Sequence, residues 1–125
     1  MKIILDTNFL LIPGSLGIDV MSLIKDVEPT AEFFIVDKTK QELEGIVEKQ
    51  SKKHRDSAKF ALKLIEQKNI AVIKTKTFKN VDEIIKEKAD KEGFGVATQD
   101  KGLRDLLINV PIFVLRQKKY ILRVR

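Results

Sequence analysis

Short apolar runs alternate with helical patterns along this chain, and the alternation restricts its fold more than any other feature. The first run, residues 3–5, has the length of a strand and no polar residue, which is typical of a strand buried on both faces. Further strand-like runs lie at residues 33–36, 70–73, 95–98 and 112–115, with a sixth candidate at 120–124. Strands that alternate with helices indicate a parallel sheet covered by helices.

Apolar residues recur at helical spacing between these runs. The series are Val20, Leu23, Ile24 and Val27; Leu43, Ile46 and Val47; Phe60, Ala61, Leu64 and Ile65; Ile84, Ile85 and Ala89; and Leu103, Leu106 and Leu107. The polar run 48–57 reads as a helix–helix connection. We therefore expect one domain over residues 1–125, an α/β fold with three α/β/α layers and a central, mainly parallel five-stranded sheet, followed by a basic C-terminal segment at 116–125.

Composition excludes several classes of protein. Without Cys the chain can form neither disulfides nor thiolate metal sites. No apolar run approaches the roughly 18 residues of a membrane helix, and the N-terminus lacks the pattern of a secretory signal, so we expect a cytoplasmic protein with no membrane partner. The net charge of +6 favours a polyanionic partner, with DNA, RNA and acidic lipid all open at this point.

Four acidic residues follow the ends of the first four predicted strands: Asp6, Glu42, Asp82 and Asp100. Ligands of open α/β sheets bind beyond the carboxyl ends of the strands, so all four acids are expected at that edge. Four carboxylates held together repel one another unless a cation is present. Because Mg²⁺ and Mn²⁺ prefer oxygen ligands, the sequence predicts one of these ions at this edge.

Each acid also has a purely structural interpretation. Asp6 can form a turn, and Glu42 can belong to a capping box with Thr39. Asp82 can interact with the helix dipole from the first turn of its helix, and Asp100 can cap the helix that follows it. Capping does not exclude metal binding, so both interpretations stay open. Asp37, directly after the second strand, is an alternative to Glu42.

Four segments in this order resemble the PIN-domain family of metal-dependent ribonucleases: LDTNFLL, VDKTKQELEGI, VDEIIKEKAD and GVATQDKGLRDLL. The likeness runs from residue 2 to about residue 115. It implies that the four acids are both the catalytic residues and the metal ligands. It also implies supporting roles for Thr7, Asn8 and Thr98. Some relatives carry a further acid soon after the fourth, where this chain has Lys101 and Gly102, so Asp105 is the candidate to replace it.

The resemblance implies an endoribonuclease that hydrolyses RNA with the help of one or two Mg²⁺ or Mn²⁺ ions. The segments VATQDKGLRDLL and VPIFVLRQKKYIL resemble the archaeal and eukaryotic branch that processes ribosomal RNA. A toxin ribonuclease of a toxin–antitoxin pair and a catalytically idle RNA-binding module are the alternatives. The partners implied are RNA, a second copy of the chain through the apolar first half of residues 13–27, and an antitoxin or a ribosome-assembly protein.

The basic C-terminal segment is the candidate surface for RNA. Its cations alternate with apolar residues and are Arg116, Lys118, Lys119, Arg123 and Arg125. Such alternation lets one face of an edge strand pack while the other presents positive charge to phosphate. The same charges would also protect a sheet edge from pairing with other chains, and that interpretation stays open.

Overall fold

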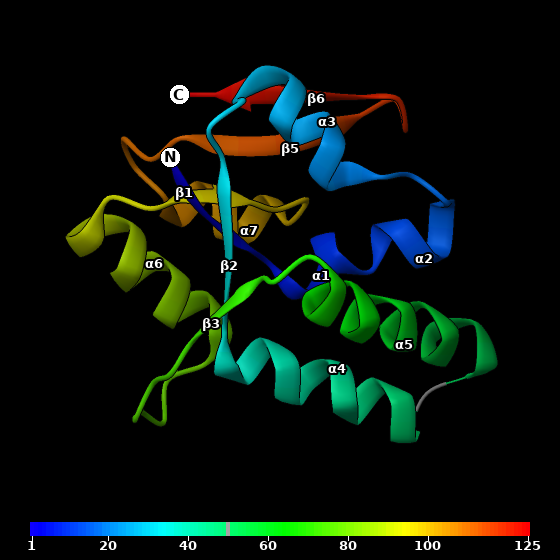
Figure 1. Cartoon of the computed structure of the whole chain (residues 1–125). Helices are drawn as coiled ribbons and strands as arrows, with labels where there is room; N and C mark the ends of the chain where they lie inside the picture. The colour runs from blue at the N-terminus through cyan, green and yellow to red at the C-terminus, as the bar shows by residue number, and fades with distance from the viewer. Residues whose placement is uncertain (50) are drawn as a thin grey trace.

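The computed structural model describes residues 1–49 and 51–125 and contains one six-stranded sheet (Figure 1). The strands are β1 (Lys2–Leu5), β2 (Glu32–Val36), β3 (Ala71–Ile73), β4 (Gly95–Ala97), β5 (Ile112–Arg116) and β6 (Tyr120–Val124). They lie in the order β3-β2-β1-β4-β5-β6, and all neighbouring pairs are parallel except β5 and β6. The predicted, mainly parallel α/β sheet is confirmed, with one strand more than the five expected.

The sixth strand exists because the C-terminal segment folds back as a hairpin. Arg116 pairs with Tyr120 at the turn and Ile112 pairs with Val124 at the far end, so β6 runs antiparallel to β5. Ile121 is buried against the sheet's core, whereas Tyr120 and Leu122 are exposed. The alternation seen in the sequence therefore belongs to an edge strand with one face packed.

Helices cover both faces of the sheet: α1 (Thr7–Leu10), α2 (Ile12–Leu16), α3 (Val20–Val27), α4 (Asp37–Lys49), α5 (Lys52–Gln67), α6 (Val81–Glu92) and α7 (Lys101–Leu106). Helices α1, α2, α3, α4 and α5 pack on one face of the sheet through one apolar core. Helices α6 and α7 pack on the opposite face through a second core. Successive residues of β1 alternate between the cores: Ile3 and Leu5 lie in the first, and Ile4 in the second. The three-layer prediction is confirmed.

Two local features differ from the sequence-based expectation. The chain continues after β1 as the short helices α1 and α2, where a turn was one interpretation of LDTN. The expected connection at 48–57 is much shorter, because α4 extends to Lys49 and α5 begins at Lys52. Ser57 and Ala58 are buried, so the end of this charged run is the packed face of a helix. Residue 50 of the expected connection lies outside the described residues.

Within residues 1–49 and 51–125 no single helix is long and apolar enough to cross a membrane. The helical segments Thr7–Leu16 and Val20–Val27, which meet at a bend of 115°, together have the length and composition of a membrane span.

Candidate active site

Asp6 follows the central strand β1 and is almost fully buried, with 4% of its surface exposed. Its side chain caps α1 by accepting a hydrogen bond of 2.8 Å from the backbone N–H of Thr7. The Oγ1 of Thr98 donates a second bond, of 2.7 Å, to its Oδ2. Burial raises the pKa of Asp6, repulsion from Asp82 and Asp100 adds to the rise, and the two hydrogen bonds oppose it. Asp6 therefore caps α1, and its ionised carboxylate is also electrostatically unfavourable at this buried position.

Thr98 connects Asp6 to the next acid along the sheet edge. It follows β4, is completely buried, and accepts a hydrogen bond of 3.1 Å at Oγ1 from the backbone N–H of Asp100. Asp100 in turn caps α7, because its Oδ1 accepts from the backbone N–H of Leu103 at 3.3 Å. One hydroxyl thus fixes the spacing between a carboxylate after β1 and a residue after β4. The T-x-D pattern in the sequence is the local sign of this link.

Gln99, between these two residues, is a positioning residue that the sequence did not reveal. Its side-chain amide donates to the backbone carbonyl of Leu115 at 2.9 Å and accepts from the same residue's N–H at 2.7 Å. The side chain therefore acts like one more peptide unit of the β4–β5 ladder. It ties the segment that carries Asp100 to the carboxyl end of β5.

Glu42 and Asp82 approach the same edge from two helices. Glu42 lies in the second turn of α4, and Asp82 lies in the first turn of α6, which Asn80 caps through a 2.9 Å bond to the N–H of Glu83. Glu42 as a whole is exposed, yet desolvation of its carboxyl group and repulsion from Asp6 and Asp82 raise its pKa. Desolvation and repulsion from Asp100 raise the pKa of Asp82.

Mutual repulsion thus links all four predicted acids: Asp6, Glu42, Asp82 and Asp100. The structure brings these carboxylates to one edge of the sheet, and their assignment as catalytic residues and metal ligands stays a prediction. The capping-box interpretation of residues 39–42 is wrong, because α4 begins at Asp37 and Thr39 lies inside the helix. Thr39 is fully buried instead, and its Oγ1 lies 3.4 Å from that of Thr7.

The four acids fit a hard divalent cation by donor chemistry and charge. All their donors are oxygens, and a cation relieves the repulsion that helps to raise the pKa values of Asp6, Glu42 and Asp82. In the part of the chain that the structure describes, no three His, Cys, Asp or Glu side chains converge closely enough to hold one ion as they stand. Mg²⁺ does not require such a cage, since it keeps several waters and binds through one or two carboxylates plus substrate phosphate.

Asp37 and Asp105, the two alternative acids, have other partners. Asp37 accepts hydrogen bonds from the backbone N–H of Thr75 at 2.9 Å and from its hydroxyl at 2.6 Å. Burial alone would raise the pKa of Asp37, but these bonds lower it overall. Asp105 is exposed and pairs with Lys101 at 3.0 Å. Neither residue takes part in the repulsive network, so the structure favours Glu42 over Asp37.

Asn8, the remaining supporting candidate, lies exposed in α1, two residues beyond Asp6. Thr7 beside it is buried and contributes its backbone N–H to Asp6.

The basic C-terminal segment divides between the two edges of the sheet. Arg116, Lys118 and Lys119 lie at the carboxyl end of β5, which is the edge that carries the acids. Arg123 is paired with Glu28 at 3.0 Å and lies over the ring of Phe113. The end of β6 turns back to the opposite edge, where Arg125 donates to backbone carbonyls at the end of α7.

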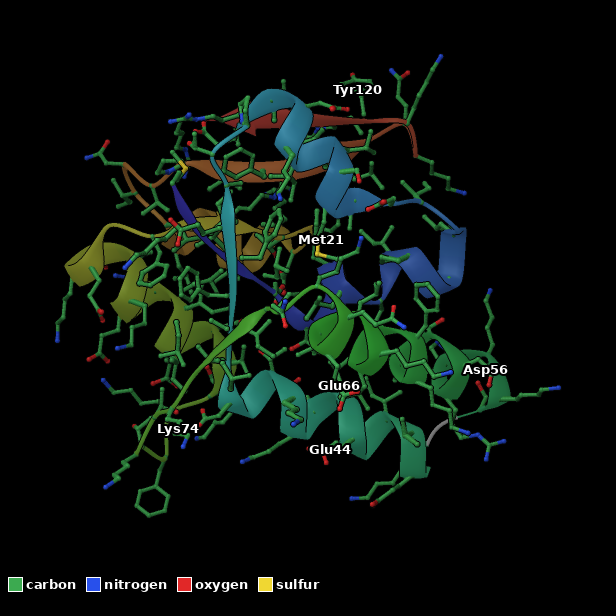
Figure 2. The ribbon with its side chains drawn as sticks, in the orientation of Figure 1. Met21, Glu44, Asp56, Glu66, Lys74 and Tyr120 are labelled. Atoms are coloured by element: carbon green, nitrogen blue, oxygen red, sulfur yellow. The ribbon has the colours of Figure 1, made fainter. Side chains whose placement is uncertain are left out.

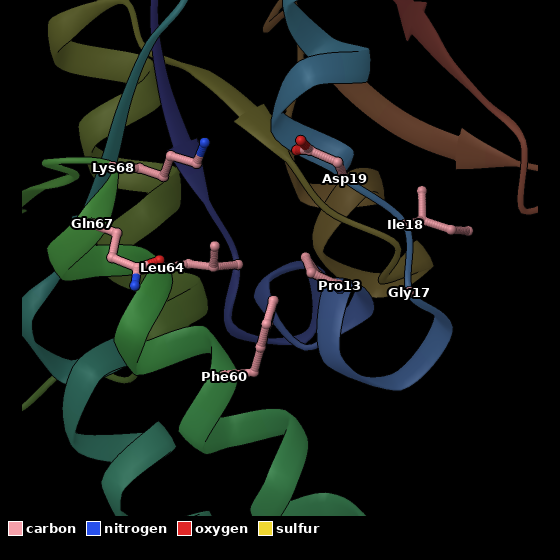
Figure 3. Close-up of a pocket in the computed structure, with 8 residues that line it drawn as sticks. All are labelled: Pro13, Gly17, Ile18, Asp19, Phe60, Leu64, Gln67 and Lys68. Carbon is pink, nitrogen blue, oxygen red and sulfur yellow. The ribbon is translucent and has the colours of Figure 1, made fainter.

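A cavity of about 360 Å³ lies apart from the acids, between the α2–α3 connection and α5 (Figure 3). Its lining is formed by Pro13, Gly17, Ile18, Asp19, Phe60, Leu64, Gln67 and Lys68. It contains none of the four acids. Part of the first half of the 13–27 segment, which is the predicted dimer interface, lines the cavity, and that interface stays a prediction.

A family model described as a PIN-like domain matches residues 3–118, which is most of the chain. The chain belongs to the PIN-like domain family. This confirms the family that the four sequence segments indicated, and the comparison with curated proteins found no match.

Solved structures show the same fold at low sequence identity. The PIN domain endonuclease Utp24 is 22% identical with a TM-score of 0.80, covering 99% of this chain and 91% of that one. The VapBC2 complex of Rickettsia felis, bound to a promoter DNA fragment, is 16% identical with a TM-score of 0.67, covering 93% and 100%. A domain of a functionally unknown protein from Methanocaldococcus jannaschii is 16% identical with a TM-score of 0.61, covering 99% of this chain and 97% of that one.

Proposed function

We propose that this PIN-like domain is a divalent-metal-dependent endoribonuclease. The observation that carries the proposal is the set of four mutually repelling carboxylates at the carboxyl edge of the sheet, where burial and this repulsion raise the pKa values of Asp6, Glu42 and Asp82. A protein gains nothing in stability from holding such repelling charges together without a counter-ion. Similarity to an endonuclease of the same fold supports the choice of phosphodiester hydrolysis.

The residues of the chain divide the work according to how firmly each is held. Asp6 is locked between Thr98 and the N–H of Thr7, so it provides a fixed carboxylate. Glu42 and Asp82 have no comparable side-chain bonds among the described residues, and this leaves them free to adjust to a metal and a substrate phosphate. A bound divalent ion supplies an activated water and neutralises charge on the phosphate oxygens. Attack by water leaves 5′-phosphate and 3′-hydroxyl ends.

Processing of ribosomal RNA is the physiological role that we propose. The segments from β4 onward resemble that branch of the family, and the match to endonuclease Utp24 has a higher TM-score than the match to the toxin–antitoxin complex, 0.80 against 0.67. The toxin role is the second candidate, because the structural match covers the whole of the matched chain from that complex.

Cleavage of a structured RNA in Mn²⁺ or Mg²⁺, with EDTA as the metal-free control, tests the activity. Asp6→Asn should abolish cleavage and preserve RNA binding, since the amide can still cap α1 but cannot supply the charge. Asp105→Asn is the matched control, because Asp105 is exposed and paired with Lys101. Wild-type rates for Asp6→Asn, or cleavage that persists in EDTA, would contradict the proposal.

A further inference from the structure

The loop between β3 and α6, residues 74–80, combines three lysines with one aromatic side chain in the sequence KTKTFKN. Figure 1 shows the loop projecting below β3, and Figure 2 labels Lys74 at its start. Phe78 is fully exposed, with a relative exposure of 106%. A single exposed apolar residue needs no explanation, but this ring stands within a basic loop that leads into the helix carrying Asp82. Because the ring buries no surface, it adds nothing to folding through the hydrophobic effect.

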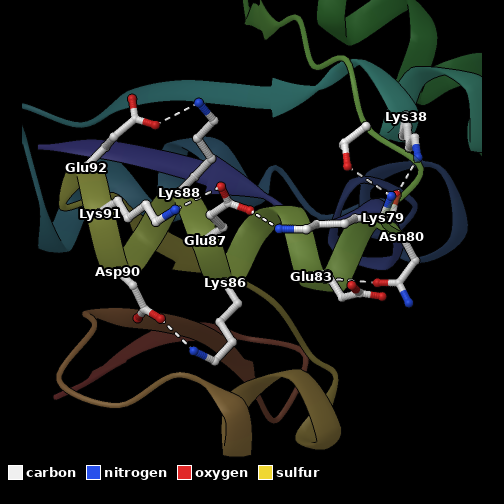
Figure 4. A network of polar contacts seen from close by, with 11 residues as sticks. Lys38, Lys79, Asn80, Glu83, Lys86, Glu87, Lys88, Asp90, Lys91 and Glu92 are labelled. Carbon is white, nitrogen blue, oxygen red and sulfur yellow. Dashed lines mark hydrogen bonds and ion pairs between the residues drawn. The ribbon is translucent and has the colours of Figure 1, made fainter.

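Specific bonds hold the loop in position. Asp37, at the start of α4, accepts two bonds from Thr75. Lys38 donates through Nζ to the backbone carbonyl of Lys79, and Asn80 caps α6 (Figure 4). Phe78 is therefore presented on an anchored loop. Binding of a ligand to this anchored loop costs less backbone entropy than binding to a loop without such bonds would.

The loop also forms a positively charged hollow. A cavity of about 290 Å³ is lined by Lys74, Lys76, Lys79 and Lys88, with Glu87 as its one acid. Glu87 is engaged by Lys79 at 2.6 Å and by Lys91 at 3.2 Å. Of the residues that the structure describes, none is an anionic partner of Lys74 or Lys76. The hollow thus has unpaired positive charge and room for a phosphate group.

The loop leads from the edge strand β3 into α6, the helix that carries Asp82. It begins after β3, whose last residue, Ile73, pairs with Val36. It ends at Asn80, two residues before Asp82. The end of the loop is thus next to the acid Asp82 in the chain, and RNA bound at Asp82 can extend to the loop.

We propose that the 74–80 loop grips an unpaired segment of the RNA substrate, with Phe78 stacking on a base and Lys74 and Lys76 contacting adjacent phosphates. The inference rests on the proposed function, because it takes RNA as the substrate. An aromatic side chain beside cations is the usual way in which proteins hold single strands. Bases within a duplex have no free face, so the loop selects unpaired RNA close to the cleavage site.

Fluorescence tests the stacking directly, because the chain has no Trp. Phe78→Trp introduces a single reporter, and Ile108→Trp, at a position 73% exposed in the turn after α7, is the matched control. An unpaired RNA oligonucleotide in EDTA should quench the fluorescence of Trp at 78 and leave that at 108 unchanged. Equal quenching at both positions, or none at 78, overturns the proposal.

The affinity of each variant for the same oligonucleotide measures how much the loop contributes to binding. Phe78→Ala should weaken binding about five- to a hundredfold, since stacking on one base has that effect, and Phe78→Leu should not restore it. The double variant Lys74→Ala/Lys76→Ala should reduce the slope of log affinity against log salt by about 1.4, at roughly 0.7 for each phosphate contact on a single strand. Melting temperatures should not change, because none of these side chains is buried.

Two further results separate this inference from the proposed function. Cleavage by wild-type protein, together with unaltered binding by Phe78→Ala, would overturn the loop proposal and leave the nuclease intact. Binding that depends on Phe78 without any cleavage in Mn²⁺ would support the loop proposal and contradict the nuclease proposal.

Vesicles of phosphatidylserine and phosphatidylcholine are the control for an acidic lipid surface. A blue shift of the Trp at 78 on these vesicles, without quenching by RNA, overturns the proposal.

Discussion

The hydroxyl of Thr98 donates a 2.7 Å hydrogen bond to the carboxylate of Asp6, joining residues 92 positions apart in the chain. Because the same oxygen accepts from the backbone N–H of Asp100, one buried side chain sets the positions of two of the four acids. Thr98 is completely buried and acts through these two residues, so it is a positioning residue. Its importance is open to direct tests.

Thr98→Val removes this hydroxyl and keeps the shape of the side chain. Because the proposed function makes Asp6 a metal ligand, we expect cleavage to fall about 10- to 100-fold, as is usual when the residue that orients such a ligand is lost. The unfolding free energy should drop by about 1–3 kcal/mol, because a buried carboxylate loses its donor. Thr98→Ser retains the hydroxyl and should recover most of the activity. Wild-type cleavage by Thr98→Val, measured beside its melting temperature, would show that the bond does not position Asp6.

The acid cluster should make the metal-free protein more stable as the pH falls below neutral. Burial and mutual repulsion raise the pKa values of Asp6, Glu42 and Asp82 above their ordinary values of 3.8 for Asp and 4.5 for Glu. The folded protein therefore binds protons more tightly than the unfolded chain, and protonation through these raised values increases the unfolding free energy. We expect the melting temperature in EDTA to rise as the pH is lowered from 7 to about 5.

At lower pH the sign reverses, because Asp37, Asp19 and Glu87 have lowered pKa values and stabilise the fold only while ionised. Asp6→Asn/Asp82→Asn should lose most of the rise seen between pH 7 and about 5, whereas Asp105→Asn should keep it. A wild-type melting temperature that falls throughout this range would argue against a repulsive cluster.

Gly14 in α2 packs against the backbone of α5. A Cβ at this position would lie 2.7 Å from the Cα of Ser57 and 3.3 Å from the Cβ of Phe60. Gly14→Ala should therefore destabilise the protein by about 1–3 kcal/mol, as overpacking usually does. Gly45→Ala is the matched control in α4, where a Cβ meets nothing within 4 Å, and it should stabilise by about 0.5–1 kcal/mol. Denaturant melts measure both changes, and equal effects would contradict the close contact.

The two parts of the C-terminal segment should affect RNA binding differently. Lys118→Ala/Lys119→Ala removes two cations from the hairpin turn at the acid edge, so the salt dependence of RNA affinity should become shallower by about 1.4 log units per log unit of salt. Arg123→Ala breaks the pair with Glu28, so it should reduce stability and leave that slope unchanged. A larger loss of slope for Arg123→Ala would place the RNA path along β6.

The sequence by itself determined the order of strands and helices and the edge at which the four acids lie. Both follow from local patterns, since Ile3, Ile4 and Leu5 are apolar enough to form a central strand and ligand sites in open α/β sheets lie beyond the carboxyl ends of the strands. The sequence also indicated that Asp100 caps a helix, because a cap depends on the next three residues alone.

Only the tertiary structure decided which of these side chains meet. The bond from Thr98 to Asp6 depends on β4 pairing with β1, and the attachment of Asp37 to Thr75 depends on β3 pairing with β2. The antiparallel return of β6 separated Arg123 from the cations of the turn. Hydrogen bonds require atoms within about 3 Å, and that approach is set by sheet order and register, which residues distant in the chain fix together.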